Sequence, residues 1–150
     1  MMVSVALFQP DIPQNTGAIM RLCACFDVDL HLIEPMGFVL SEPKLKRSGM
    51  DYIDYLTLHR HASWEHFKDV SAQKRVILLT TKAKTSFWDF EFQDDDILLF
   101  GSESAGVADY VHEQAQHAVI IPMRPEVRSL NLACSASIVL AEAIRQTTEK

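Results

Sequence analysis

Short apolar segments spaced along the whole chain constrain its fold more than any other feature of the sequence. They lie at residues 3–8, 30–33, 76–79, 97–100 and 118–121. The run Val-Ile-Leu-Leu at 76–79 contains no polar residue, which is typical of a strand whose two faces are both covered. Segments with helical periodicity separate these strands. The alternation predicts an α/β fold with a mostly parallel sheet and helices on both of its faces.

Helices are predicted where apolar residues recur every three or four positions. The first long helix starts near Asn15 or Thr16, either of which is a suitable N-cap. The last long helix runs from Asn131, its predicted N-cap, to about residue 147, with Ser129 as an alternative cap. Ser63 is predicted to cap a helix ending near residue 70. The other elements expected are helices at 43–48, ended by Gly49, and at 108–115, and a short strand at 52–58.

Length and composition predict one soluble domain spanning residues 1–150. No apolar run approaches the roughly 20 residues of a membrane span and no secretory signal is visible, so we expect a cytoplasmic protein without a membrane partner. Cys23, Cys25 and Cys134 match no disulfide framework or zinc spacing, and we interpret them as buried free thiols with no metal. The net charge of −6 disfavours nucleic-acid binding unless a local basic patch supports it.

The positions of the five glycines argue against several common nucleotide sites. They form neither G-x-G-x-x-G nor G-x-x-x-x-G-K-[ST], the two common loops that hold phosphates. No serine has glycines two residues to either side, as a hydrolase nucleophile elbow would. Dinucleotide dehydrogenases and P-loop NTPases are therefore disfavoured. A flavodoxin-like small-molecule enzyme fits the alternation alone, but it too would need a phosphate loop.

Three clusters of glycines and polar residues flank the predicted strands. They contain Asn15, Gly17 and Arg21; Gly101, Glu103 and Gly106; and Arg124, Arg128 and Asn131. A glycine early in a helix costs about 1 kcal/mol relative to alanine, which indicates that another group passes close to the backbone at Gly17. Ligands of open α/β sheets bind at loops that follow the strands, as the second and third clusters do. Taken singly, the clusters also fit a capped helix, a simple turn and solvated arginines.

Together, in their order and spacing, these clusters resemble the TrmH-like branch of the SPOUT class of RNA methyltransferases, and most closely its small members that methylate nucleotide 34 of tRNA. The matching motifs are Pro13-x-Asn15-x-Gly17-x-x-x-Arg21, Leu99-Phe100-Gly101-x-Glu103-x-x-Gly106, and Ile121-Pro122-Met123 followed by Ser129-Leu130-Asn131-Leu132. The sequence departs from the family pattern at Ala105, Ala133 and Ala141. The resemblance covers nearly the whole chain.

The resemblance implies a trefoil knot in the C-terminal half and a site for S-adenosyl-L-methionine between three loops. Carried over by position, the residues implied to bind this cofactor are Leu79, Thr80, Gly101, Ile121, Met123, Ser129 and Leu130. The implied catalytic residues are Arg21, Asn15, Glu103 and Asn131. Because an arginine hardly ever loses its proton, we interpret Arg21 as stabilising the developing alkoxide and positioning an RNA phosphate.

The implied reaction is methylation of the ribose 2′-hydroxyl of cytidine or uridine 34, in the anticodon region of tRNA, by a homodimer whose acceptor site is built from both subunits. Candidate RNA-binding residues are Lys44, Lys46, Arg47, Arg124 and Arg128, with His59, Arg60 and His61 beside the first three. A solvated helix face is the alternative for that patch. Methylation of another tRNA or rRNA nucleotide, and a catalytically weak RNA-binding module, are the alternative functions.

Overall fold

The core of the protein is a six-stranded sheet in which every neighbouring pair of strands is parallel. The computed structural model describes residues 2–47, 51–127 and 130–148, and of residues 42, 46 and 47 only the backbone. The strand order is β3-β2-β1-β5-β4-β6. The strands are β1 (Ser4–Phe8), β2 (Leu30–Ile33), β3 (Leu58–His61), β4 (Val76–Leu79), β5 (Ile97–Phe100) and β6 (His117–Val119).

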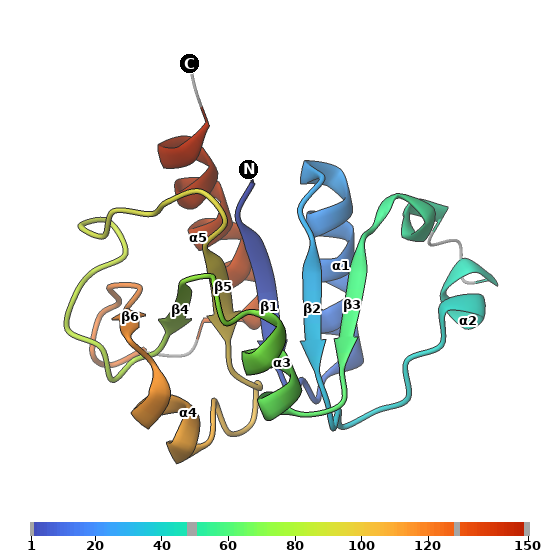
Figure 1. The fold of residues 1–150 in the computed structure, drawn as a ribbon, viewed down its shortest axis with the longest axis horizontal. Coiled ribbons are helices and arrows are strands. Elements are labelled where there is room, and N and C mark those ends of the chain that lie inside the picture. Colours follow the sequence, from blue (N-terminus) through green and yellow to red (C-terminus); the bar gives the residue numbers. More distant parts are fainter. Residues whose placement is uncertain (1, 48–50, 128–129, 149–150) are drawn as a thin grey trace.

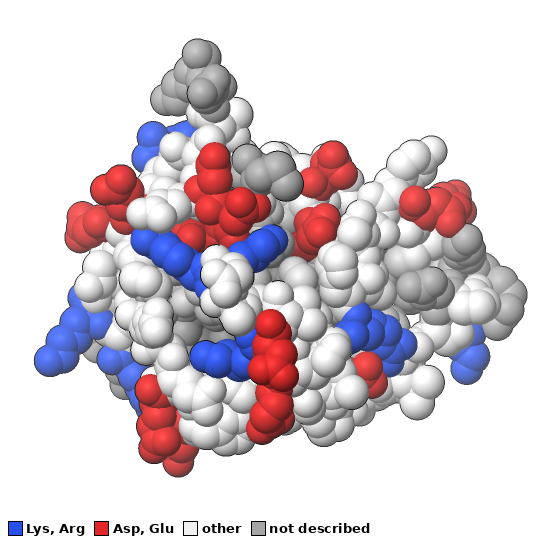
Figure 2. All heavy atoms as spheres, in the orientation of Figure 1, with Lys and Arg blue, Asp and Glu red and all other residues white. Residues whose placement is uncertain are grey.

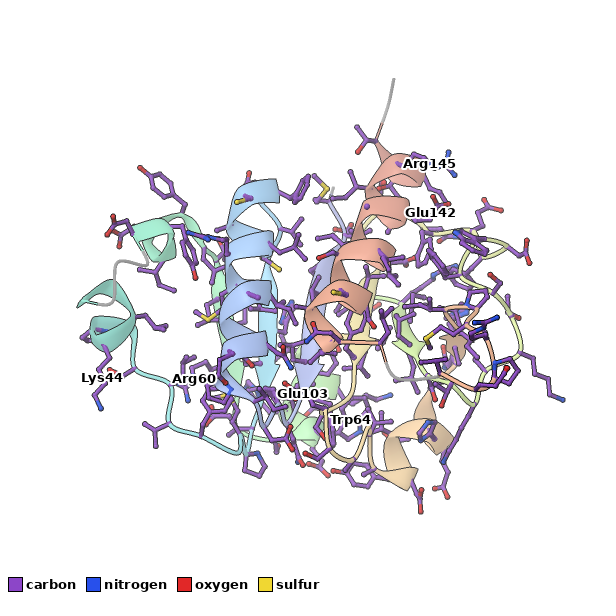
Figure 3. All side chains as sticks on the ribbon, turned by 180° about the vertical axis from the view of Figure 1, so that it is seen from behind. Lys44, Arg60, Trp64, Glu103, Glu142 and Arg145 are labelled. Carbon is purple, nitrogen blue, oxygen red and sulfur yellow. The ribbon has the colours of Figure 1, made fainter. Side chains whose placement is uncertain are left out.

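Helices cover both faces of this sheet (Figure 1). Two long helices, α1 (Pro13–Phe26) and α5 (Leu132–Thr147), lie side by side on one face, as the view from behind also shows (Figure 3). The shorter α3 (Trp64–Val70) and α4 (Asp109–Gln114) lie on the other face. A short α2 (Glu42–Arg47) and a 3₁₀ helix, η1 (Asp51–Tyr55), precede β3 at the edge of the sheet. The predicted α/β class is confirmed.

Successive residues of the strands enter two separate core layers, because side chains of a strand point alternately to opposite faces. Val5 and Leu7 of β1 pack in the layer beneath α1 and α5, whereas Ala6 and Phe8 pack in the layer beneath α3 and α4. All five residues of β1 are buried. The need to fill both layers explains why these segments carry few polar residues.

Most predicted elements are confirmed, including the strands at 30–33, 76–79 and 97–100. The predicted strand at 52–58 is wrong: this segment forms η1, and β3 begins only at its last residue. Ile53 packs into the core there, and the hydroxyl of Tyr52 donates to the carbonyl oxygen of Gly17 at 3.2 Å. These contacts favour a compact turn over an extended strand. They also supply the close approach to Gly17 expected from the sequence.

The helix starts were predicted with mixed success. Asn131 caps α5, its side-chain oxygen accepting from the amides of Ala133 and Cys134 at 2.8 and 3.2 Å. Ser63 likewise caps α3. The predicted caps of the first helix are wrong, because α1 begins at Pro13 and Asn15 and Thr16 lie inside it. Proline favours the first turn of a helix. The predicted stop at Gly49 and the alternative cap Ser129 lie outside the described residues.

Candidate functional site

A cavity of about 600 Å³ opens where the carboxyl ends of β4, β5 and β6 meet. This is the edge at which open α/β sheets bind ligands, and the volume is in the range of small-molecule sites. The loops that follow the three strands form its walls, and the starts of α1 and α5 close it. The lining residues used below are Asn15, Leu79, Thr80, Lys82, Gly101, Glu103, Gly106, His112, Ile120, Ile121, Met123, Leu130 and Asn131.

The loop after β5 is a closed turn that only glycines allow. The amides and carbonyls of Ser102 and Gly106 exchange two hydrogen bonds of 2.9 Å. A side chain at Gly101 would place its Cβ 2.4 Å from the carbonyl carbon of Gly106, and Gly106 itself has a φ of +68°. The close approach at Gly101 excludes a side chain there, and the positive φ at Gly106 disfavours one. The turn thereby holds Glu103 toward the start of α1, where Figure 3 labels it.

A chain of hydrogen bonds joins the three sequence clusters. The side-chain amide of Asn131 donates to the side-chain oxygen of Asn15 at 3.0 Å. The amide of Asn15 in turn donates to Glu103 at 3.1 Å, and the second carboxylate oxygen of Glu103 accepts from the backbone amide of Asp11 at 3.2 Å. A hydrogen bond from the Ser104 hydroxyl is the main cause of a lowered pKa at Asp11. This series of hydrogen bonds fixes the start of both long helices against the loop after β5.

The loop after β4 is held by Thr80 and by His112, a residue of α4. The hydroxyl oxygen of Thr80 accepts from the backbone amide of Lys82 at 3.2 Å and lies 3.1 Å from Nε2 of His112. Since that oxygen is already an acceptor, its own proton can be donated to the ring nitrogen. His112 was not predicted as a site residue. No motif marks it, because it reaches the cavity only through the packing of α4.

The cavity fits a donor such as S-adenosyl-L-methionine in its chemistry. Leu79, Ile121, Met123 and Leu130 offer apolar surface for a flat ring, and the loop backbones offer polar groups for its edges. Glu103 adds a carboxylate to the lining, which suits a ligand that carries positive charge. A phosphate-binding loop is not needed, since this ligand has no phosphate.

The cavity brings together most of the predicted site residues. Six of the seven predicted cofactor-binding residues line it, and the seventh, Ser129, lies outside the described residues. Asn15, Glu103 and Asn131 also line it. Arg21 does not: it is exposed on α1, with its guanidinium carbon 5.3 Å from the centroid of the Tyr52 ring. Within one chain, Arg21 therefore lies apart from the cavity.

The predicted RNA-binding patch is less basic than its sequence indicates. Lys44 is exposed on α2, on the side of α1 away from Glu103 (Figure 3). Both guanidinium contacts of Arg60 to Glu34 are 3.3 Å long. His61 is buried, and burial lowers its pKa, so it provides no surface charge at neutral pH.

The other predicted RNA-binding residues lie partly outside the part of the chain that the structure describes. The side chains of Lys46 and Arg47, and all of Arg128, are outside the described residues. Arg124 is exposed in the loop after β6.

The cysteines correct another interpretation. Cys23 is buried, and burial raises the pKa of its thiol to about 12. Cys25 and Cys134 are exposed, so the expectation of three buried thiols is wrong for these two. Among the residues that the structure describes, no three His, Cys, Asp or Glu side chains are grouped so that they could hold a metal ion. Within the same residues, no helix is both long and apolar enough to cross a membrane.

Comparison with known proteins identifies close relatives. Residues 2–141 match the SpoU rRNA Methylase family. The chain is 51% identical to the tRNA (cytidine(34)-2′-O)-methyltransferase of Beijerinckia indica over 144 residues, which cover 95% of this chain and 90% of that protein. A structure solved for the 2-OH methylation of C/U34 on tRNA is 40% identical, with a TM-score of 0.89 and coverage of 97% and 95%.

A second solved structure is relevant to the cavity. It is the SpoU methyltransferase AviRb of Streptomyces viridochromogenes in complex with the cofactor AdoMet. This structure is 26% identical to the chain, with a TM-score of 0.85. The alignment covers 97% of this chain and 57% of that one.

Proposed function

The chain belongs to the SpoU rRNA methylase family, and from that premise we propose that it transfers a methyl group from S-adenosyl-L-methionine to the ribose 2′-hydroxyl of cytidine or uridine 34 in tRNA. The observation that carries this proposal is the cavity, which all three motif loops line and the Asn131–Asn15–Glu103 hydrogen bonds hold together. The knot implied by the resemblance, and a cytoplasmic location, belong to the same proposal.

The reaction requires alignment more than activation. The donor supplies a methyl group already bonded to a positive sulfur, so its transfer forms one O–C bond and breaks one S–C bond, and the 2′-hydroxyl loses a proton. The apolar wall of Leu79, Ile121 and Leu130 would exclude water and orient the donor. Holding both reactants in one geometry accounts for much of the rate that such a site must provide.

In this proposal, Arg21 acts on the acceptor RNA. Its permanent positive charge suits it to bind an RNA phosphate and stabilise the developing alkoxide. Because it lies outside the cavity of its own chain, we place it in the site of a second copy within a homodimer. α1 and α5 also carry exposed apolar residues, Phe26 and Ile138, that such a contact could cover. Arg21→Lys should keep donor binding and lose most turnover.

The proposed reaction is tested with labelled donor and tRNA unmodified at nucleotide 34, followed by mass spectrometry of the nucleosides. We expect 2′-O-methylcytidine or 2′-O-methyluridine that maps to position 34. Label at another tRNA nucleotide or in rRNA would retain the chemistry and reject the target. Donor binding without any label would favour the RNA-binding module.

The dimer is tested by mixing inactive subunits. Co-expressed Arg21→Ala and Glu103→Gln chains form mixed dimers in which one site has both native residues, provided that Arg21 acts across the interface. We expect each variant alone to be inactive and the mixture to recover activity. Inactive mixtures of confirmed mixed dimers would place Arg21 in the site of its own chain.

A further inference from the structure

The loop that joins β4 to β5 presents an aromatic side chain that the proposed chemistry does not use. Trp88 is 65% exposed, whereas the other tryptophan, Trp64, is 4% exposed and donates its indole proton to Gln114 at 3.0 Å. Long loops without regular secondary structure are commonly functional. This loop begins inside the cavity wall at Thr80 and continues past Trp88 to residue 96.

The backbone at Trp88 is anchored although the side chain is exposed. The residue before it, Phe87, is 1% exposed, and its ring lies 5.2 Å from the Trp88 ring. The amide of Phe87 donates to the carbonyl of Ile120, and the amide of Ile120 donates to the carbonyl of Thr85, both at 2.9 Å. The amide of Trp88 donates to the hydroxyl of Ser86 at 3.1 Å. Because Ile120 lines the cavity, these bonds fix the backbone at Trp88 relative to the site.

Two lysines precede this tryptophan in its loop, and two acidic residues, Asp89 and Glu91, follow it. Lys82 lines the cavity, and Lys84 is exposed between Lys82 and Trp88 in the sequence. Arg124 is exposed in the loop that starts at Ile120, next to the anchored segment. Figure 2 shows basic side chains at the left edge of this face, where Figure 1 draws the loop between β4 and β5.

We propose that Trp88 is a stacking platform for a nucleobase of the substrate RNA, next to the nucleotide that enters the cavity, with Lys82 and Lys84 beside the adjoining phosphates. An exposed aromatic ring in the same loop as two lysines is an arrangement that can bind single-stranded RNA by stacking and charge. The loop's continuity with the cavity wall favours the substrate over an unrelated partner. This inference rests on the proposed function, because it names the residue that holds the RNA of that reaction.

Intrinsic fluorescence tests the contact directly. An anticodon stem–loop RNA is titrated into the protein without donor, and the emission of Trp88 is followed at two protein concentrations. Stacking should quench this emission, while the buried Trp64 contributes a constant background. In Trp88→Phe, which keeps an aromatic ring, the quenching should disappear while RNA affinity falls only slightly. Because no methyl transfer is needed, this arm stays informative if the proposed reaction fails.

Kinetics provide the second arm. Trp88→Ala should raise the KM for tRNA about 5- to 150-fold, the range expected for one stacked base, with unchanged donor affinity. Val70→Ala, which shortens another exposed apolar side chain, should match the parent protein. Lys84→Ala should reduce the salt dependence of RNA binding by about one phosphate contact.

Two results would overturn the inference. One is unquenched Trp88 emission together with an unchanged KM in Trp88→Ala, while the parent protein still methylates tRNA. The other is an emission change that follows protein concentration instead of RNA, which would assign Trp88 to a contact between copies of this chain.

Discussion

Acidification should destabilise this protein through two buried histidines, His31 and His61, which belong to a cluster of four at the edge of the sheet. His31 of β2 lies between His59 and His61 of β3, with ring centroids 4.7 and 5.2 Å away. His61 in turn contacts His66 of α3, with ring centroids 5.1 Å apart. Nδ1 of His31 is 2.9 Å from Nε2 of His61, so at least one of these nitrogens must be without a proton. Burial of His31 and His61 favours the neutral form of these two rings.

The size of the effect follows from the pKa of His31. Burial is the main cause that lowers this pKa from 6.5 to about 4; His59, His61 and Lys74 add to the change, and Asp29 opposes it. Because the pKa is lower in the folded state, the stabilisation is present above about pH 6.5 and is lost as the pH falls toward 4. A tenfold difference in proton affinity is about 1.4 kcal/mol, so between about pH 7 and pH 5 His31 alone should remove about 2 kcal/mol from the free energy of unfolding.

Urea unfolding at these two pH values, at one protein concentration, measures the loss. His31→Gln lacks the titrating ring, so its free energy of unfolding should be lower at neutral pH but should fall about 2 kcal/mol less on acidification than that of the parent protein. His117→Gln, on β6 and outside the cluster, is the matched control and should keep the parent dependence. Equal losses in the parent protein and in His31→Gln would refute the reasoning.

Four further variants test the site and its frame. Gly101→Ala should weaken donor binding at least about tenfold, measured by calorimetry, because its Cβ meets the backbone of Gly106. The Cβ of Gly106→Ala meets no atom, so this variant should cost only about 1–2 kcal/mol of stability for its left-handed backbone. Weaker donor binding in Gly106→Ala than in Gly101→Ala would contradict the loop geometry. Asn131→Asp keeps the oxygen that caps α5 but cannot donate to Asn15, so turnover should fall while the melting temperature is unchanged. A large drop in melting temperature would assign Asn131 a purely structural role. Arg75→Met removes the guanidinium that contacts Asp96 at 2.9 and 3.0 Å. Because Asp96 is 1% exposed, the free energy of unfolding in urea should fall by about 3 kcal/mol. An unchanged midpoint would show that the ion pair adds nothing to stability.

The sequence predicts those features that depend on local pattern. β4 and β5 were predicted at their observed bounds, because a strand covered on both faces must be apolar throughout. Asn131 was predicted as a cap because capping needs only the residue and the helix that follows it. The cavity residues of the three motifs came from the resemblance, which adds the spacing of a whole family to the local pattern.

The features that escape the sequence depend on contacts between distant segments. The pairing of Asn15 with Asn131 joins residues 116 positions apart, and nothing local to either residue indicates it. His61 looks like part of a basic patch in the sequence, but the register that places His31 beside β3 buries it. The strand predicted at 52–58 is wrong for the same reason. The hydrogen bond from Tyr52 to Gly17 joins distant segments, and no local pattern indicates it.

The hydrogen bonds between Asn131, Asn15 and Glu103 also determine when the site can form during synthesis. A ribosome makes the chain from its N-terminus, so β1, α1 and the loop holding Glu103 emerge well before Asn131. Asn15 must therefore wait for a partner synthesised 116 residues later, and the loop after β6 lacks its anchor until α5 leaves the ribosome. We therefore expect a chain arrested before Asn131 to bind the donor poorly, because Asn15 would lack this partner.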